Sequence, residues 1–224
     1  MISDCTALIL AGGESRRMGQ DKASLLLGEH TLLQSVVATL QPLFAEVIVS
    51  VRQPRDEIDL PQVCDDLLHN GPLAGLVAGL ESINTPWLFA LACDMPFITP
   101  AVIERLDCCR PKPLPTSPCQ GRSLSPSLIR EGWGGLGVAC QAIVPMVRGY
   151  PQPLAAFYAA SCLPVARDCI KGSGKHSLRE LLERLQVCYV NEAELLKADP
   201  TLASFFDLDT PQDMATAKNQ MEIK

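Results

Sequence analysis

The segment LILAGGESRRMGQDK near the N-terminus combines the groups that are needed to bind a polyphosphate. It places two adjacent glycines, Gly12 and Gly13, ahead of the cations Arg16, Arg17 and Lys22. Glycine lets the backbone approach an anion closely, free N–H groups form an anion nest, and nearby cations neutralise the remaining charge. The alternative is an ordinary connector turn with solvated arginines.

Two well-known phosphate motifs do not fit this segment. A P-loop is excluded because Gly19 is followed by Gln20 and Asp21 before Lys22. The dinucleotide fingerprint G-x-G-x-x-G cannot be drawn from Gly13 onward either. We therefore interpret the segment as a glycine loop with its own set of cations.

A second feature is an aspartate at the end of a buried strand. Asp94 directly follows the apolar run WLFALAC and precedes Met95 and Pro96. In parallel sheets, ligands bind beyond the carboxyl ends of the strands. A carboxylate held there could bind Mg²⁺, which takes one or two carboxylates together with water and phosphate oxygens. A helix cap or turn residue is the alternative interpretation.

The C-terminal run FFDLDTPQDM carries two more carboxylates. Asp207 and Asp209 are spaced i, i+2, so on an extended segment both side chains point to the same face and could reach one metal ion. Asp209 also precedes a predicted helix and could instead interact with the helix dipole.

Composition limits the classes of function. The 224 residues suit one α/β domain, and a net charge of −6 does not favour nucleic-acid binding. No run of apolar residues is long enough to span a membrane, and the first residues do not resemble a secretion signal. We therefore expect a cytoplasmic monomer. The ten cysteines are scattered without a C-x-x-C pair, and we expect them to be reduced and to pack as small apolar side chains, as at Cys5, Cys64, Cys93 and Cys188.

Apolar runs alternate with helix signals along the chain. Strands are predicted at residues 6–10, 46–51, 87–93, 142–147 and 186–190, most of them apolar nearly throughout. Helix starts are predicted at Thr31, Thr99, Ser177 and Thr210 from capping residues. Such alternation predicts a Rossmann-like α/β fold, a doubly wound, mostly parallel sheet with helices on both faces.

The stretch from 110 to 137 breaks this pattern. It holds five prolines, five glycines and four serines in 28 residues and has neither strand nor helix periodicity. We interpret it as an insertion in an otherwise single domain, either as a surface loop or as a lid over the substrate.

Four motifs in order resemble those of the molybdenum cofactor guanylyltransferases, the MobA-like branch of the nucleotidyltransferases. They are LAGGESRRMGQDK, the GPLAG of Gly71 to Gly75, CDMPFI from Cys93, and FFDLDTPQDM. The resemblance spans roughly residues 5–109 and 140–218. It implies that GMP is transferred from GTP to molybdenum-molybdopterin, with release of pyrophosphate and with Mg²⁺ as cofactor. Transient contacts with other proteins of cofactor biosynthesis are also implied.

The resemblance assigns roles to individual residues. For the nucleotide it implies Leu10, Ala11, Gly12, Gly13 and Gly75, and also Asp65, where the neighbouring Asp66 leaves the register open. Lys22 and Asp94 would bind the nucleotide and act in catalysis, with Arg16 supporting the phosphates. The predicted metal ligands are Asp94 and Asp209. Gln152 is predicted to contact the pterin acceptor. The family often has asparagines where this chain has Asp207 and Asp209.

Three alternatives to this function remain open, and one is that the insertion makes the protein inactive or unstable. A cytidylyltransferase for the same pterin, or a transferase for another phosphorylated acceptor, would use similar motifs, although Gly12-Gly13 resembles the guanylyl branch. A regulatory domain that binds nucleotide without turnover is the third alternative, but it would have less need for Lys22 and Asp94 together.

Overall fold

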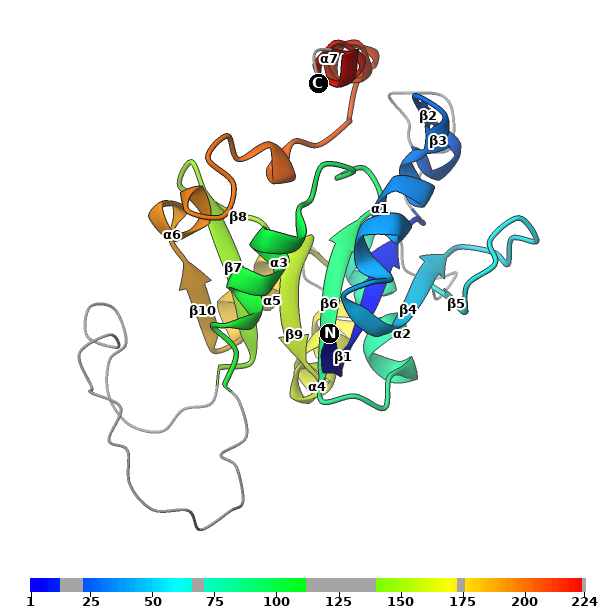
Figure 1. The fold of residues 1–224 in the computed structure, drawn as a ribbon. Coiled ribbons are helices and arrows are strands. Elements are labelled where there is room, and N and C mark those ends of the chain that lie inside the picture. The colour runs from blue at the N-terminus through cyan, green and yellow to red at the C-terminus, as the bar shows by residue number, and fades with distance from the viewer. Residues whose placement is uncertain (13–21, 66–70, 112–139, 173–175, 223–224) are drawn as a thin grey trace.

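The structure is a computed structural model that describes residues 1–12, 22–65, 71–111, 140–172 and 176–222. Its centre is a twisted sheet with helices on both faces (Figure 1). Within the described residues, no helix is long and apolar enough to cross a membrane.

The main sheet runs in the order β10-β7-β9-β6-β1-β4-β5, with the short β8 paired to β7. β1 is parallel to β4 and β6, β4 to β5, and β7 to β10, whereas β9 is antiparallel to both β6 and β7. The predicted mostly parallel sheet is therefore confirmed. The strands are β1 (Ile2–Leu10), β4 (Phe44–Val51), β5 (Gln62–Cys64), β6 (Trp87–Ala92), β7 (Ala142–Val147), β8 (Tyr150–Pro151), β9 (Ala155–Ala159) and β10 (Val187–Val190).

The helices begin where the capping residues predicted. Thr31 and Gln34 form a complete capping box at α1 (Leu32–Leu40). Thr99 caps α3 (Pro100–Asp107) and Ser177 caps α5 (Leu178–Arg184) with their side chains. The remaining helices are α2 (Pro72–Ser82), α4 (Leu163–Lys171), α6 (Glu192–Leu196) and α7 (Pro211–Glu222), and a small sheet pairs β2 (Leu26–Leu27) with β3 (His30–Thr31).

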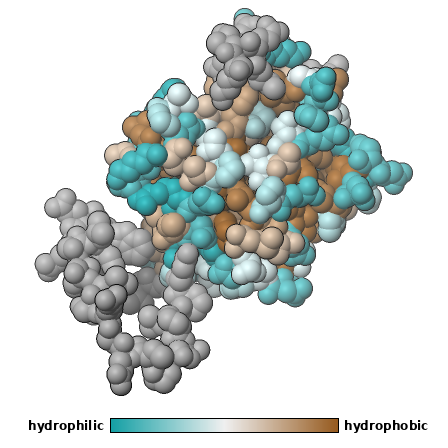
Figure 2. All heavy atoms as spheres, viewed as in Figure 1, coloured by the Kyte–Doolittle hydropathy of each residue, from teal (hydrophilic) through white to brown (hydrophobic). Residues whose placement is uncertain are grey.

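The two faces of the sheet are both covered by helices. Along β1, Ala7 and Ile9 face one core, and Leu8 between them faces the other. The first core includes buried residues of α1, α3 and α6, and the second includes those of α2, α4 and α5. This arrangement is the predicted doubly wound fold. The face of the molecule drawn in Figure 2 carries both hydrophilic and hydrophobic residues, as is usual for such a domain.

The cysteines differ from the prediction in two respects. Cys140 and Cys188 form a disulfide with a Cα–Cα distance of 6.0 Å, although 48 positions separate them. Pairing of β10 with β7 brings the two together, and spacing alone did not reveal it. Cys64 is exposed rather than buried, because it ends the short strand β5 at the edge of the sheet. Cys5 and Cys93 are buried, as predicted.

Most of the predicted insertion, residues 112–137, lies outside the described residues. Arg110, its predicted first residue, belongs to the folded domain. Its buried guanidinium lies over the rings of Trp87 and Phe157 and pairs with Asp4 and Asp107. Aromatic stacking and ion pairing are typical of a structural arginine. The boundary of the predicted insertion therefore moves past Arg110.

Candidate active site

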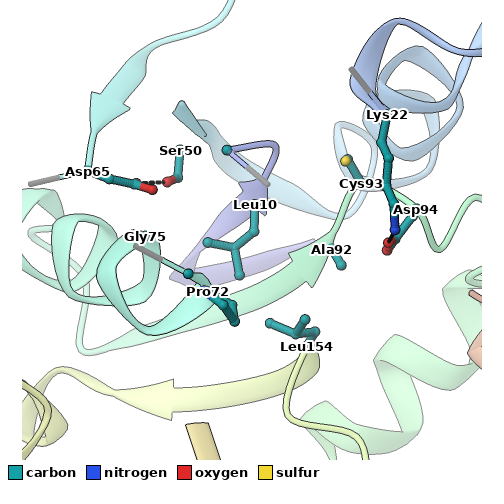
Figure 3. Close-up of a pocket in the computed structure, with 12 residues that line it drawn as sticks. Leu10, Lys22, Ser50, Asp65, Pro72, Gly75, Ala92, Cys93, Asp94 and Leu154 are labelled. Carbon is teal, nitrogen blue, oxygen red and sulfur yellow. Dashed lines mark hydrogen bonds and ion pairs between the residues drawn. The ribbon is translucent and has the colours of Figure 1, made fainter. Parts of the chain in front are cut away.

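A pocket of about 190 Å³ opens at the carboxyl ends of β1, β4 and β6 (Figure 3). This is the edge of a parallel sheet where ligands are expected to bind. The pocket is lined by residues from both the glycine segment and the acidic segments, namely Leu10, Gly12, Lys22, Ser50, Asp65, Gly71, Pro72, Gly75, Ala92, Cys93, Asp94 and Leu154.

The backbone after β1 is fixed by its two neighbouring strands. The Ala11 N–H donates to the Ser50 carbonyl at 3.0 Å, and the Cys93 N–H donates to the Leu10 carbonyl at 3.2 Å. Ala11 is buried in the core and is not among the lining residues, whereas Leu10 and Gly12 line the pocket. Gly13 and Arg16 lie outside the described residues, so their predicted roles stay predictions.

Lys22, Asp94 and Asp209 form what we call the cation end. Lys22 and Asp94 line the pocket, whereas Asp209 is not among the lining residues and joins this group through its contact with Lys22. The Lys22 ammonium donates to Asp94 Oδ2 at 2.7 Å and also contacts Asp209 Oδ1. Figure 3 shows the lysine side chain extended toward Asp94. Lys22 and Asp94 are largely buried, with 18% and 17% of their side chains exposed, whereas Asp209 is 49% exposed. Three distant parts of the sequence therefore meet at one ammonium group.

The segment 207–209 is held against β6 by its middle residue. The Leu208 N–H donates to the Asp94 carbonyl at 3.0 Å, and the Leu208 side chain is buried beside Leu27 and Leu32. Because Leu208 faces this small core, its two acidic neighbours are directed away from it, as the i, i+2 spacing predicted. The N-terminus of α7 is capped instead by Thr210 and Asp213, which hydrogen-bond each other.

Burial and the neighbouring carboxylates shift the pKa values of Lys22 and Asp207 at the cation end. Burial alone would lower the pKa of Lys22, but hydrogen bonds from the ammonium to Asp209 and Asp94 outweigh it, so the pKa is raised. Although much of the Asp207 side chain is exposed, partial burial of its carboxyl raises its pKa to about 6, with further contributions from the charges of Asp94 and Asp209. Lys22 is therefore cationic at neutral pH.

Gly12, Ser50, Asp65 and Gly75 form what we call the glycine end of the pocket. Figure 3 shows Ser50, Asp65 and Gly75 on the opposite side of Leu10 from Lys22 and Asp94. The Ser50 hydroxyl donates to Asp65 Oδ1. Burial raises the pKa of Asp65, while the Ser50 hydrogen bond and the charge of Arg52 oppose that rise. A Cβ on Gly12 would lie 3.0 Å from Asp65 Oδ2, so the glycine allows this carboxylate to approach the backbone.

The GPLAG motif forms the start of helix α2, which was not among the predicted helix starts. Gly71 is the N-cap of α2 with φ of 108°, a conformation that favours glycine, and Pro72 occupies the first turn. A Cβ on Gly75 would lie 2.5 Å from Leu10 Cδ2 and 2.6 Å from Ser50 Oγ. Gly75 thus lets α2 pack closely against β1 and β4, and it brings the N-terminus of the helix to the pocket.

The acceptor prediction at Gln152 falls beside the pocket rather than in it. Gln152 is not among the lining residues, and its backbone N–H donates to the Pro145 carbonyl at 2.9 Å. Leu154, two positions later, does line the pocket. The predicted contact of Gln152 with the acceptor stays a prediction.

Ser50 and Leu154 are among the lining residues that sequence reasoning did not assign to the site. Ser50 is a polar residue at the end of the apolar strand β4, so the rule that identified Asp94 could also have found it. Leu154 lies between the short strands β8 and β9, and β9 was not predicted. No signal in the sequence marks Leu154 as part of a pocket.

The donor set at the cation end fits a hard divalent cation. One ammonium group contacts oxygens of both Asp94 and Asp209, so these carboxylates lie close enough to share a single cation. Within the described part of the chain there is no cluster of three or more His, Cys, Asp or Glu residues that could hold a metal ion. Two carboxylates suffice for Mg²⁺, which completes its shell with water and phosphate oxygens.

A pocket at the carboxyl ends of parallel strands, with glycine on one side and a lysine-carboxylate group on the other, is typical of α/β proteins that act on nucleotides. Residues 7–188 match the MobA-like NTP transferase domain, and the chain belongs to that family of nucleotidyltransferases.

Individual relatives agree with this assignment over nearly the whole chain. The molybdenum cofactor guanylyltransferase of Syntrophotalea carbinolica is 30% identical over 96% of this chain and 91% of its own. The crystal structure of molybdopterin-guanine dinucleotide biosynthesis protein A from Archaeoglobus fulgidus has a TM-score of 0.75 and 25% identity, with 98% of this chain and 100% of that chain covered. The fold is also similar to 2-C-methyl-D-erythritol 4-phosphate cytidylyltransferase from Thermus thermophilus, at a TM-score of 0.61 and 18% identity over 97% and 98% of the two chains.

Proposed function

We propose that this protein transfers GMP from GTP to the terminal phosphate of molybdenum-molybdopterin and releases pyrophosphate, with Mg²⁺ bound by Asp94 and Asp209. The observation that carries the proposal is the meeting of Lys22, Asp94 and Asp209 at a pocket that Gly12 also lines. Relatives named for this activity match nearly the full chain and support the choice of substrates.

The reaction requires positioning and charge stabilisation rather than a covalent intermediate on the protein. An oxygen of the acceptor phosphate forms a bond to the α-phosphorus of GTP, the bond from that phosphorus to the bridging oxygen breaks, and pyrophosphate carries away the electron pair. Mg²⁺ would supply positive charge to the phosphates when it is bound by the two aspartates. In this proposal the Lys22 ammonium meets the phosphates and offsets the charge that develops on the leaving group.

The glycine end is assigned to the nucleoside. Asp65 presents a carboxylate that Ser50 fixes and that lies close to the Gly12 backbone, because Gly12 has no Cβ. A carboxylate that accepts hydrogen bonds is complementary to N–H or O–H donors of a nucleoside. The N-terminus of α2 lies at the same end and adds its partial positive charge.

Nucleotide competition tests the guanylyl assignment. GTP with Mg²⁺ should raise the melting temperature of the protein more than CTP at equal concentration, because only a ligand that binds the folded state stabilises it. Pyrophosphate release should require both GTP and molybdenum-molybdopterin. Protection by CTP but not by GTP would refute the guanylyl assignment, and binding of GTP without any turnover would favour a regulatory domain.

A further inference from the structure

Lys22 spans two carboxylates that come from distant parts of the chain. Its ammonium is 2.7 Å from Asp94 Oδ2, 72 positions away, and contacts Asp209 Oδ1, 187 positions away. Both contacts use oxygens that the proposed function assigns to Mg²⁺. The ammonium therefore occupies the place between the two carboxylates where a divalent cation would have to bind.

Charge balance explains why a cation is needed at this place. Asp94 and Asp209 each place a carboxylate oxygen in contact with the same ammonium group. Carboxylates so close together repel one another unless a cation lies between them. Lys22 provides one positive charge, and its side chain, which is only 18% exposed, keeps that charge partly shielded from water.

The carboxylate oxygens that contact the Lys22 ammonium cannot bind it fully and also bind a metal ion at the same time. A lysine ammonium has three donors on a flexible stem, so it can move from carboxylates to other anions if such anions are within reach. A nucleoside triphosphate in the adjoining pocket would offer them. Without a triphosphate, displacing Lys22 would leave a partly buried cation without a partner, which is costly.

We propose that Lys22 is the resident cation of the Asp94–Asp209 pair in the nucleotide-free protein, and that a divalent cation takes its place only when a nucleoside triphosphate receives the released ammonium. The inference rests on the proposed function for the identity of the two metal ligands. It predicts that metal and nucleotide bind cooperatively, and linkage requires that each tightens the other by the same factor.

The test measures the affinity of the nucleotide-free, full-length protein for Mn²⁺. The electron paramagnetic resonance signal of the free ion reports how much Mn²⁺ remains unbound. Lys22→Gln and Lys22→Met both remove the ammonium, and the second keeps the apolar stem. Each should bind Mn²⁺ more tightly than the wild type, by a factor of roughly 5 to 150, the usual range for coupled sites. Addition of GTP should tighten Mn²⁺ binding strongly in the wild type and only weakly in the variants.

Two control variants show whether the change in Mn²⁺ affinity depends on the Lys22 ammonium and on the Asp94 carboxylate. Arg55→Gln removes a cation that pairs with Glu57 and Ser24 instead, so it should leave Mn²⁺ affinity unchanged. The double variant Lys22→Gln with Asp94→Asn should lose the tight binding. Folded Lys22 variants that bind Mn²⁺ no more tightly than the wild type would overturn the inference. A wild type that releases no pyrophosphate would refute the proposed function while leaving this comparison intact.

Discussion

The two ends of the pocket hold their carboxylates in different ways. At the glycine end, Asp65 accepts a hydrogen bond from the Ser50 hydroxyl and lies against a glycine backbone, and burial raises its pKa. At the cation end, Asp94 is bound by the ammonium of Lys22. The Ser50 hydroxyl is neutral and holds the Asp65 carboxylate in place, whereas the Lys22 ammonium is a cation on a flexible side chain that another cation can replace. We therefore assign nucleoside recognition to the glycine end and the exchange of one cation for another to the cation end.

The largest expected effect is at the cation end. Asp94→Ala should lower the rate of pyrophosphate release by at least about 10²- to 10³-fold, because the variant loses a group that holds positive charge near the reacting phosphates. The fold should persist, since the rest of β6 is unchanged. Steady-state kinetics and circular dichroism check this, with Asp168→Ala, which removes an exposed aspartate paired with Arg184, as the matched control. Unchanged turnover in Asp94→Ala would remove the proposed mechanism.

At the glycine end, an added Cβ should lower the free energy of unfolding, and it should weaken GTP binding only where it also displaces Ser50. Gly75→Ala would place a Cβ against Leu10 and the Ser50 hydroxyl, with an expected cost of about 1 to 3 kcal/mol in the free energy of unfolding. It should also weaken GTP binding through displacement of Ser50. Gly79→Ala, one helical turn later, is the control, because the atoms nearest to its added Cβ belong to the Leu8 and Leu88 side chains. Urea titration and calorimetry measure both effects, and equal loss of GTP affinity in the two variants would contradict this account.

A smaller effect is expected from a second substitution at the glycine end. Ser50→Ala removes the hydrogen bond to Asp65 and should cost about 0.5 to 1.5 kcal/mol, seen as weaker GTP binding with little change in Mn²⁺ binding. Ser82→Ala removes a hydroxyl that bonds to a helix carbonyl away from the pocket and should change neither. If Ser50→Ala weakened Mn²⁺ binding as much as GTP binding, the two ends would not be separate in function.

The smallest effect concerns pH. The pKa of Asp207 is raised to about 6 in the folded protein, whereas an unfolded aspartate titrates near 4. Between those values the folded state binds more protons, so its contribution to stability falls as pH rises. In metal-free protein, Asp207→Asn should remove this decline and add up to about 1 kcal/mol at pH 7, once solvent screening is allowed for. Thermal unfolding from pH 4 to 8 tests it, and parallel curves for the two proteins would contradict it.

The parts of the fold with long apolar runs could be predicted from the sequence. The run WLFALA became β6, and Asp94 follows it at the edge of the sheet as the rule for parallel sheets requires. Capping residues also placed the helix starts, because their side chains bond to the first N–H groups locally. These signals depend on neighbours in the sequence, and so they can be recognised there.

The parts that depend on packing could not be predicted. Helix α2 was not predicted, because its N-cap Gly71 has no side chain to give a capping signal, and the spacing of Gly75 and Gly79, which places both toward the sheet, matters only through packing. The contact of Lys22 with Asp209 depends on how segment 207–209 docks beside β6 through Leu208. The disulfide between Cys140 and Cys188 likewise follows from the pairing of β7 with β10.

The most direct test is a crystal structure of the protein with GTP and Mn²⁺, in which anomalous scattering locates the metal. The account predicts one peak bound by the carboxylates of Asp94 and Asp209, with the Lys22 ammonium moved onto the phosphates. A peak elsewhere, or Lys22 still held between the two aspartates with the nucleotide bound, would contradict it.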